Sequence, residues 1–305
     1  MFLEQGVIPQ NHFYKYLLGS LAVIIASSVG QLPMLIAIYF KAVNKEVAFP
    51  STNEAIMHFF DSNTTLFLML VSFVFALGAM FLVIRLFHNQ TILSVTTARP
   101  KIDWKRVFFS FGLWAVIGVI TTGIEWYLNP SFFQVNFNFD AFIVLFLIGI
   151  VLIPIQTSTE EYIFRGYLMQ GFANLFHNKW APLLMTSLIF GLLHWFNPEV
   201  GKMGNSIMIF YIGTGLFLGV VTLMDDGMEL ALGFHAANNL IGALLVTSNW
   251  TAFQTNSILK DVSEPTLGFD VILPVVLIYP ILLLIFGRKY KWNNWKEKLT
   301  GNIKI

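Results

Sequence analysis

Cysteine is absent from the 305 residues of this chain, and charged residues make up only 11% of it. Without cysteine, disulfide bonds, thiol catalysis and cysteine-ligated metal sites are excluded. Soluble domains have about a quarter of their residues charged, whereas 56% of this chain is hydrophobic and its mean hydropathy is +0.69. These values predict a polytopic membrane protein, and the net charge of +1 gives no support for nucleic-acid binding.

Several sequence motifs are also missing. The chain has no H-E-x-x-H of zinc-dependent proteases and no G-x-S-x-G of serine hydrolases, so these routes of peptide hydrolysis fit badly. It has no internal repeat, which counts against a secondary transporter. The N-terminus lacks the basic start and small-residue cleavage site of a signal peptide, so we expect it to remain part of the protein.

Apolar runs long enough to cross a bilayer recur along the chain. They predict an all-α polytopic membrane protein with about eight transmembrane helices in one bundle. The predicted spans are Tyr16–Phe40, Thr65–Phe87, Val107–Leu128, Ala141–Gln156, Ala181–Trp195, Asn205–Met224, Glu229–Ser248 and Val271–Phe286. The fourth and fifth are short for lipid-exposed helices, and Glu160–His177 between them is predicted to be an amphipathic helix. We expect kinks at Pro33 and Pro154.

Basic residues indicate how the chain is oriented. They are concentrated in the segment 99–106 and in the tail after the eighth span, whereas the loops 129–140 and 249–270 contain only Lys260. Lys and Arg are enriched in cytoplasmic loops. We therefore expect both termini to face the cytoplasm, which requires an even number of spans.

The most informative stretch is Q-T-S-T-E-E-Y-I-F-R-G-Y-L, residues 156–168, which directly follows the fourth apolar run. It places Glu160, Glu161 and Arg165 where ionisable side chains are costly and usually functional. Glu161 and Arg165 have the i,i+4 spacing of an ordinary helical ion pair. Glu160 lies about 100° round the helix from Glu161, so one arginine does not easily serve both carboxylates. Glu160 is therefore a candidate general base.

Two further polar pairs have i,i+4 spacing. Phe190 and His194 close the fifth span, although a histidine at a membrane boundary is most often only an interfacial side chain. His235 and Asn239 share one face of the seventh span among small residues, where they could equally form hydrogen bonds between helices. His235 is, however, the one histidine well inside a predicted span. Asn238 is adjacent, but the spacing favours Asn239.

The three motifs E-E-x-x-x-R, F-x-x-x-H and H-x-x-x-N, in this order, resemble those of the CPBP group of intramembrane endopeptidases. That group includes the CAAX prenyl proteases and the bacterial Abi proteins. The resemblance covers about residues 140–245, the expected catalytic core of a single transmembrane domain formed by residues 1–305. It implies peptide-bond hydrolysis in an intramembrane cavity, with a peptide or membrane-anchored protein as substrate. It also implies an integral protein of a bacterial cell membrane, in contact with the lipid bilayer.

The resemblance further implies a role for each motif residue. Glu160 would be the general base that activates water, and His194 would hold that water or share its proton. His235 and Asn239 would donate hydrogen bonds to the oxyanion of the tetrahedral intermediate. The remaining motif residues would play supporting parts: Glu161, Arg165 and Phe190.

Alternatives to this interpretation remain at the level of the sequence. We expect no cofactor, but Glu160, His194 and His235 could supply the three protein ligands of a catalytic zinc ion with an open fourth position. A non-catalytic immunity or scaffold protein could hold a hydrophobic peptide in the same place, although it would not need these three side chains. A transporter with a relay of protons through its buried charges is a third possibility.

One geometric difficulty concerns the depth of these residues in the membrane. If the fourth, fifth and seventh spans run straight, Glu160 and His235 lie near the cytoplasmic side and His194 lies nearer the outside. Convergence requires that the fifth span begin in the cytoplasm, or that the helix carrying Glu160 dip into the bilayer.

Overall fold

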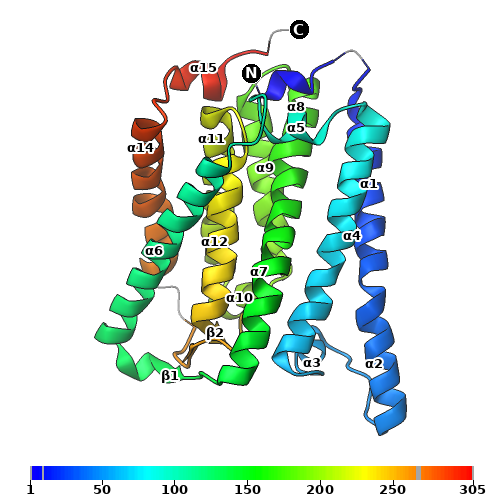
Figure 1. Ribbon diagram of the computed structural model, residues 1–305, viewed down its shortest axis with the longest axis vertical. Helices are drawn as coiled ribbons and strands as arrows, with labels where there is room; N and C mark the ends of the chain where they lie inside the picture. The colour runs from blue at the N-terminus through cyan, green and yellow to red at the C-terminus, as the bar shows by residue number, and fades with distance from the viewer. Residues whose placement is uncertain (1, 9, 266–268, 304–305) are drawn as a thin grey trace.

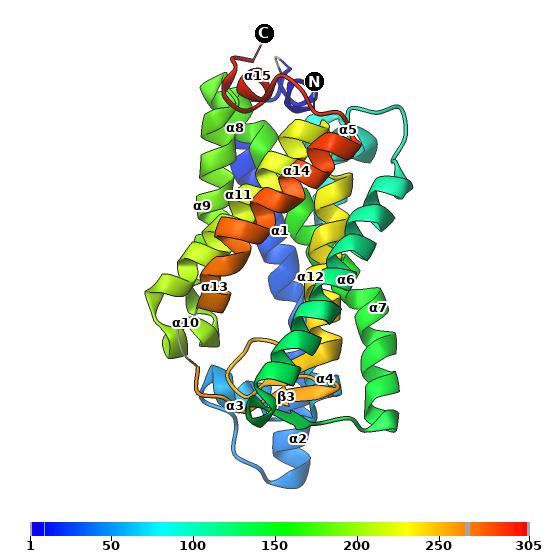
Figure 2. The same ribbon diagram turned by 90° about the vertical axis from the view of Figure 1, so that its left-hand side faces the viewer.

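The computed structural model describes residues 2–8, 10–265 and 269–303. These residues form one bundle of long helices, with short helices and strands at its two ends (Figures 1 and 2). This arrangement confirms the predicted all-α polytopic membrane fold.

The elements follow one another along the chain with short connections. The long helices are α1 (Phe13–Gly30), α2 (Leu32–Lys45), α4 (Ser62–His88), α6 (Trp104–Leu128), α7 (Phe139–Glu161), α9 (Trp180–Leu193), α11 (Met208–Asp225), α12 (Glu229–Leu245) and α14 (Tyr279–Lys289). The shorter helices are α3 (Asn53–Met57), α5 (Ile92–Thr96), α8 (Met169–Phe176), α10 (Pro198–Met203), α13 (Phe269–Leu273) and α15 (Trp295–Thr300). The strands are β1 (Phe133–Val135), β2 (Val246–Ser248) and β3 (Leu259–Asp261).

Each of the eight predicted spans contains helix, but the helices differ in length. Among the described residues, six helical segments are long and apolar enough to cross a membrane: Phe13–Lys45, Ser62–His88, Trp104–Leu128, Phe139–Phe176, Asn205–Asp225 and Val271–Lys289. The fifth predicted span is a shorter apolar helix, Trp180–Phe196, and the seventh, α12, has 17 residues. The prediction of eight full spans is therefore not confirmed.

The fourth span does not end at Gln156, as the sequence predicted. α7 continues to Glu161, and a π-helical turn joins it to α8, so that the segment Phe139–Phe176 is helical throughout. The helix predicted at Glu160–His177 is therefore present, as the continuation of α7. Two acidic side chains interrupt the apolar pattern there without interrupting the helical backbone.

Proline acts differently in the first and fourth spans. α1 ends at Gly30, and Pro33 lies in the first turn of α2. Proline suits that turn because its missing N–H group is not needed there. Pro33 therefore begins a second helix, where the sequence predicted a kink within one, whereas Pro154 lies inside α7.

Polar residues fix where the long helices begin and end. Asp61, Asp103 and Asn138 accept hydrogen bonds from backbone N–H groups in the first turns of α4, α6 and α7. Such caps satisfy donors that the helix itself leaves free. Asn89 and Asp226 end α4 and α11 in the left-handed conformation, which is typical of helix C-termini.

A small sheet lies at the lower end of the bundle, with the strand order β1-β3-β2. β1 is antiparallel to β3, and β2 is parallel to it. Because β2 takes up Val246–Ser248, the seventh helix ends at Leu245 and not at Ser248 as predicted. Strands of three residues are too short to give a readable alternation of apolar and polar residues, and the sequence did not predict them.

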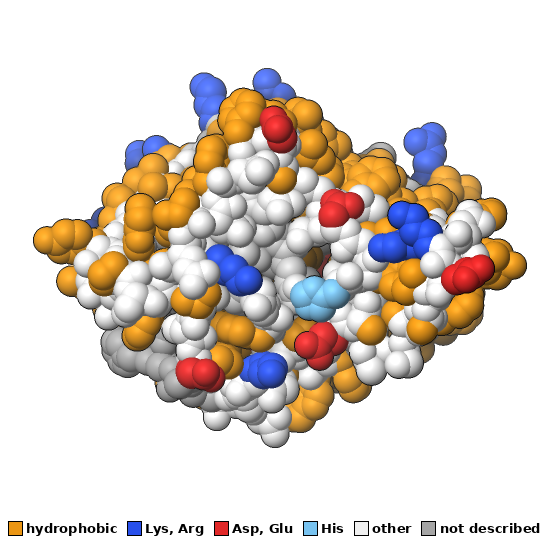
Figure 3. Space-filling view, turned by 90° about the horizontal axis from the view of Figure 1, so that it is seen from below, with side chains coloured by type: hydrophobic (Ala, Val, Ile, Leu, Met, Phe, Trp, Pro, Cys, Tyr) orange, Lys and Arg blue, Asp and Glu red, His pale blue; other side chains and the backbone are white. Residues whose placement is uncertain are grey.

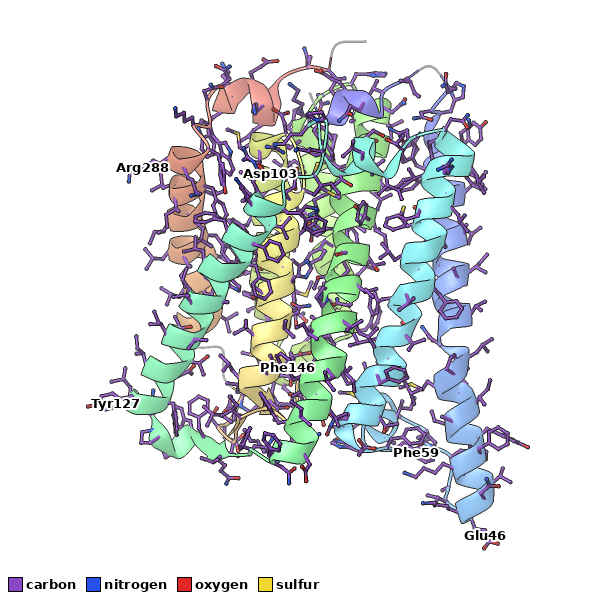
Figure 4. The ribbon with its side chains drawn as sticks, in the orientation of Figure 1. Glu46, Phe59, Asp103, Tyr127, Phe146 and Arg288 are labelled. Carbon is purple, nitrogen blue, oxygen red and sulfur yellow. The ribbon has the colours of Figure 1, made fainter. Side chains whose placement is uncertain are left out.

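Both termini lie at the same end of the bundle, the upper end in Figure 1. Asp103 and Arg288 lie toward this end, whereas Glu46 and Tyr127 lie at the opposite end (Figure 4). An even number of passes between the two ends agrees with the sequence prediction. That the shared end faces the cytoplasm stays a prediction.

The basic segment 99–106 is fastened to the turn between α11 and α12 by salt bridges. Arg99 contacts Asp225 and Glu229, at 3.0 Å each, and Arg106 contacts Asp225 at 2.5 Å. Asp225 and Glu229 are both buried. This network holds the upper ends of α6, α11 and α12 together.

The orientation can be tested with reporter fusions. A reporter after the C-terminus should report the cytoplasmic side, and the same reporter inserted in the loop 129–140 should report the opposite side, because that loop joins the lower ends of α6 and α7. Reporting of both positions on one side would contradict the predicted topology.

Candidate active site

Helices α7, α9 and α12 bring the predicted site residues into one region. Because α7 and α8 form a continuous helix to the upper end, α9 starts at that end and runs down, as α12 does (Figures 1 and 2). His194, at the foot of α9, therefore reaches the depth of Glu160 and His235, and all three side chains line one cavity. Of the two solutions to the difficulty of depth, the structure shows the first: the fifth helix begins at the end where the termini lie.

Glu161 joins the first and third motifs. Its Oε1 atom accepts hydrogen bonds from Arg165 Nη1 at 3.0 Å and from His235 Nδ1 at 2.7 Å. Glu161 and Arg165 are fully buried, and His235 is 4% exposed. A carboxylate can only accept hydrogen bonds, so the proton on His235 Nδ1 faces Glu161 and the other ring nitrogen, Nε2, faces away from it.

Arg165 has further contacts that fix its position. Its Nη2 atom donates to the carbonyl oxygen of Gly215 in α11, at 3.0 Å, and its guanidinium carbon lies 4.5 Å from the centre of the Phe190 ring. A side chain at Gly215 would place a Cβ atom 2.9 Å from the carbonyl oxygen of Ser187 in α9. Glycine therefore permits the close packing of α9 and α11 that brings this carbonyl to Arg165.

Glu160 lies beside this cluster and is not bonded to Arg165. Its Oε1 atom accepts a hydrogen bond from Gln156 Nε2 at 2.5 Å. Its Oε2 atom has no hydrogen bond and lies 3.5 Å from His235 Nε2. The side chain is 16% exposed, whereas that of Glu161 is fully buried. The two adjacent carboxylates thus have different surroundings, as the sequence predicted from their positions on the helix.

His194 is held by its own helix and by an aromatic neighbour. Its Nδ1 atom lies 2.7 Å from the carbonyl oxygen of Phe190, four residues earlier. The ring stacks on Tyr211, with the ring centres 4.5 Å apart. Because a carbonyl oxygen only accepts hydrogen bonds, Nδ1 carries the proton. Nε2 is therefore free to accept a hydrogen bond from a ligand or from water.

Both neighbouring asparagines of α12 line the cavity. Asn239 donates to Gln156 Oε1 at 3.0 Å and accepts from Asn238 at 3.0 Å. Asn238 in turn accepts from the indole N–H of Trp114 at 3.1 Å. The spacing favoured Asn239 as the inward-facing amide, but the structure turns both amides inward.

The cavity has a volume of about 1030 Å³ and extends from the motif residues to the loop after β2, where it is lined by Thr251 and Phe253. Most of its lining side chains are apolar. Seen from below, the end of the molecule is hollowed near its centre, among both acidic and basic side chains (Figure 3). A concave, mostly apolar cavity with a few polar groups is typical of a binding or active site.

The polar residues of the cavity that sequence reasoning missed include Gln156, Tyr211 and Glu199. Glu199 accepts a hydrogen bond from the backbone N–H of Ala252 at 2.8 Å, and its second oxygen has no partner. Burial raises the pKa of the Glu199 carboxyl above its ordinary value, and the bond from Ala252 partly offsets this. None of the three belongs to one of the motifs, so the spacing of residues along the chain did not indicate them.

The alternative with zinc depends on the donor atoms of the site. Among the residues that the structure describes, no three His, Cys, Asp or Glu side chains are grouped as the ligands of one metal ion. His235 bonds to Glu161 through Nδ1, and Glu160 bonds to Gln156 through Oε1, so each has only its other atom left for a ligand. That the protein works without a metal ion stays a prediction, and no step below passes through one.

Comparison with known proteins identifies relatives of the chain. A family model described as type II CAAX prenyl endopeptidase Rce1-like matches residues 138–241, which include all three motifs. The uncharacterized protein YyaK of Bacillus subtilis is 30% identical over 239 residues, covering 78% of this chain and 79% of YyaK. No solved structure matches the chain. The chain therefore belongs to the Rce1-like family of CAAX-type intramembrane proteases.

Proposed function

We propose that this protein is an intramembrane endopeptidase in which Glu160 activates the attacking water and no metal ion takes part. The observation that carries the proposal is the contrast between the two carboxylates. Glu161 is fully buried and its Oε1 atom is committed to Arg165 and His235, whereas Glu160 lines the cavity and is not bonded to Arg165. A carboxylate at a largely apolar cavity that is not bonded to the arginine suits a general base.

The reaction would proceed in two steps with balanced proton transfers. Glu160 takes a proton from water as the water oxygen attacks the carbonyl carbon of the substrate, and the carbonyl becomes an oxyanion. His194 accepts a hydrogen bond from the same water through Nε2. The proton held by Glu160 then passes to the leaving nitrogen as the carbon–nitrogen bond breaks. The products are a carboxylic acid and an amine, and no covalent enzyme intermediate forms.

Two side chains of α12 would stabilise the oxyanion. His235 would donate from Nε2, which requires a proton on both ring nitrogens because Nδ1 donates to Glu161. Asn239 would donate the N–H that it does not give to Gln156. Donors aimed at a developing oxyanion are typically worth about 10²–10³ in rate each.

The lining of the cavity and the family support the substrate class that we propose. The lining is mostly apolar, and the helices around it lie in a bundle that crosses the membrane. We propose a peptide or a membrane-anchored protein that enters with an apolar segment. Water activated by Glu160 would hydrolyse a peptide bond of this substrate beside the cluster of Glu161, Arg165 and His235.

Metal dependence is tested with the purified protein in detergent and a pool of quenched-fluorescent peptides carrying apolar segments. Cleavage by the wild type should be the same with and without phenanthroline, because no step uses a metal. The Glu160→Gln variant provides the background rate. Loss of cleavage in the chelator, followed by recovery on addition of zinc, would overturn the metal-free mechanism and favour Glu160, His194 and His235 as ligands.

A further inference from the structure

Four hydrogen bonds connect an aromatic side chain of α6 to the carboxylate of Glu160. Trp114 Nε1 donates to Asn238 Oδ1 at 3.1 Å, and Asn238 Nδ2 donates to Asn239 Oδ1 at 3.0 Å. Asn239 Nδ2 donates to Gln156 Oε1 at 3.0 Å, and Gln156 Nε2 donates to Glu160 Oε1 at 2.5 Å. We call these four bonds the amide relay.

The chemistry of its two ends fixes the direction of the relay. The indole N–H of Trp114 can only donate, and the carboxylate of Glu160 can only accept. Each amide between them must therefore present its oxygen toward Trp114 and its nitrogen toward Glu160. If any one amide were flipped, two donors or two acceptors would face each other. All four bond dipoles consequently point the same way, and aligned bonds strengthen one another.

The donor end of the relay is anchored by packing. The Trp114 ring lies with its centre 4.5 Å from the Phe234 ring and 6.2 Å from the Tyr279 ring. Phe234 and Tyr279 are both buried. The indole N–H is therefore held in place, and the relay transmits this fixed position through three amides to one oxygen of Glu160.

Resting on the proposed function, we propose that Gln156 is a positioning residue for the reaction and that the amide relay from Trp114 orients the carboxylate of Glu160. Gln156 is 4% exposed and lies one helical turn before Glu160. Because Gln156 bonds to the Oε1 atom of Glu160, the Oε2 atom of Glu160 is the oxygen without a hydrogen bond, and it lies beside His235 Nε2. Rotation of the carboxylate would break a bond to a buried amide, so the relay selects one orientation of the base.

Two matched substitutions separate positioning from simple loss of a buried amide. Gln156→Met keeps the length of the side chain and removes both hydrogen bonds. Gln170→Met makes the same change at a fully buried glutamine of α8, which bonds to Gln90 and to the Ser94 carbonyl. Gln156→Met should lower kcat on the order of 10-fold to 100-fold, as misplaced catalytic groups do, with KM nearly unchanged. Gln170→Met should leave both constants near those of the wild type.

The indole resonance of Trp114 supplies a readout that does not depend on cleavage. The chain has 8 Trp residues, so the Trp114 N–H signal is assigned by its loss in Trp114→Phe. Because the relay bonds are coupled, this signal should move upfield in Gln156→Met and in Glu160→Ala. It should stay in place in Gln170→Met. An unchanged Trp114 signal in the first two variants would overturn the relay.

The kinetic and spectroscopic results test the proposed function and the positioning role of Gln156 separately. If no peptide is cleaved in a manner that depends on Glu160, the proposed function fails, and the Trp114 signal still decides whether the relay exists. If cleavage depends on Glu160 but Gln156→Met has the kcat of the wild type, the positioning role is wrong and the proposed function stands. Should Gln156→Met not fold, Trp114→Phe removes the donor end alone. It should then lower kcat about 3-fold to 10-fold, since coupled bonds weaken together, and an unchanged kcat would overturn the proposal.

Discussion

Glu160→Gln should abolish peptide cleavage while leaving the melting temperature of the detergent-solubilised protein within about 2 °C of the wild type. A general base contributes about 10²–10⁴-fold to the rate, and an amide cannot accept the proton of the attacking water. The fold should tolerate the change because Arg165 pairs with Glu161 and not with Glu160, and the Oε1 atom of Glu160 needs only to accept from Gln156. The measurement is the rate of cleavage of a quenched-fluorescent peptide, alongside a melting curve for each variant.

The surface variant Glu54→Gln is the control for removal of a carboxylate, since Glu54 is exposed on the short helix α3 and is not among the residues that line the cavity. It should have the rate and the melting temperature of the wild type. If Glu160→Gln unfolds the protein while Glu161→Gln remains folded and inactive, the roles of the two carboxylates are the reverse of those proposed.

Glu161→Ala should have the largest effect on stability. It leaves the buried guanidinium of Arg165 without its ion pair and removes the acceptor of His235 Nδ1. Breaking a buried pair by removing one partner typically costs about 3–5 kcal/mol, which corresponds to a fall in melting temperature of roughly 10 °C. The double variant Glu161→Ala, Arg165→Ala should recover part of this loss, because the uncompensated charge is then gone.

Recovery in the double variant should be incomplete. Arg165 also donates to the Gly215 carbonyl and stacks on Phe190, and both contacts disappear with the arginine. Melting curves of the two single variants and the double variant give the coupling between the side chains. If Glu161→Ala melts at the temperature of the wild type, the pair does not stabilise the protein, and Glu161 is instead free for a direct part in the reaction.

The sequence predicted the parts of this site that depend on helical spacing. The pairing of Glu161 with Arg165 follows from i,i+4 spacing, and the separation of Glu160 from Arg165 follows from one residue of offset. The structure has both. The shared face of His235 and Asn239 was predictable for the same reason, because α12 is regular through both residues.

Other features depended on contacts between helices, which spacing along one helix does not describe. The depth of His194 followed only once α7 and α8 were seen as one helix, since the apolar pattern stops at Gln156 while the backbone does not. Gln156 carries no motif, and its importance appears only when Asn239 of another helix bonds to it. The bond between Glu161 and His235 joins residues 74 positions apart in the chain.

The central claim, that Glu160 makes this protein a protease, is tested most directly by the ends of membrane peptides. Membranes are compared from cells that make equal amounts of the wild type or of Glu160→Gln, and new peptide termini are identified by mass spectrometry. The account predicts a set of new termini at or within apolar segments in wild-type membranes that is missing from the variant. The same termini in both membranes would contradict the claim.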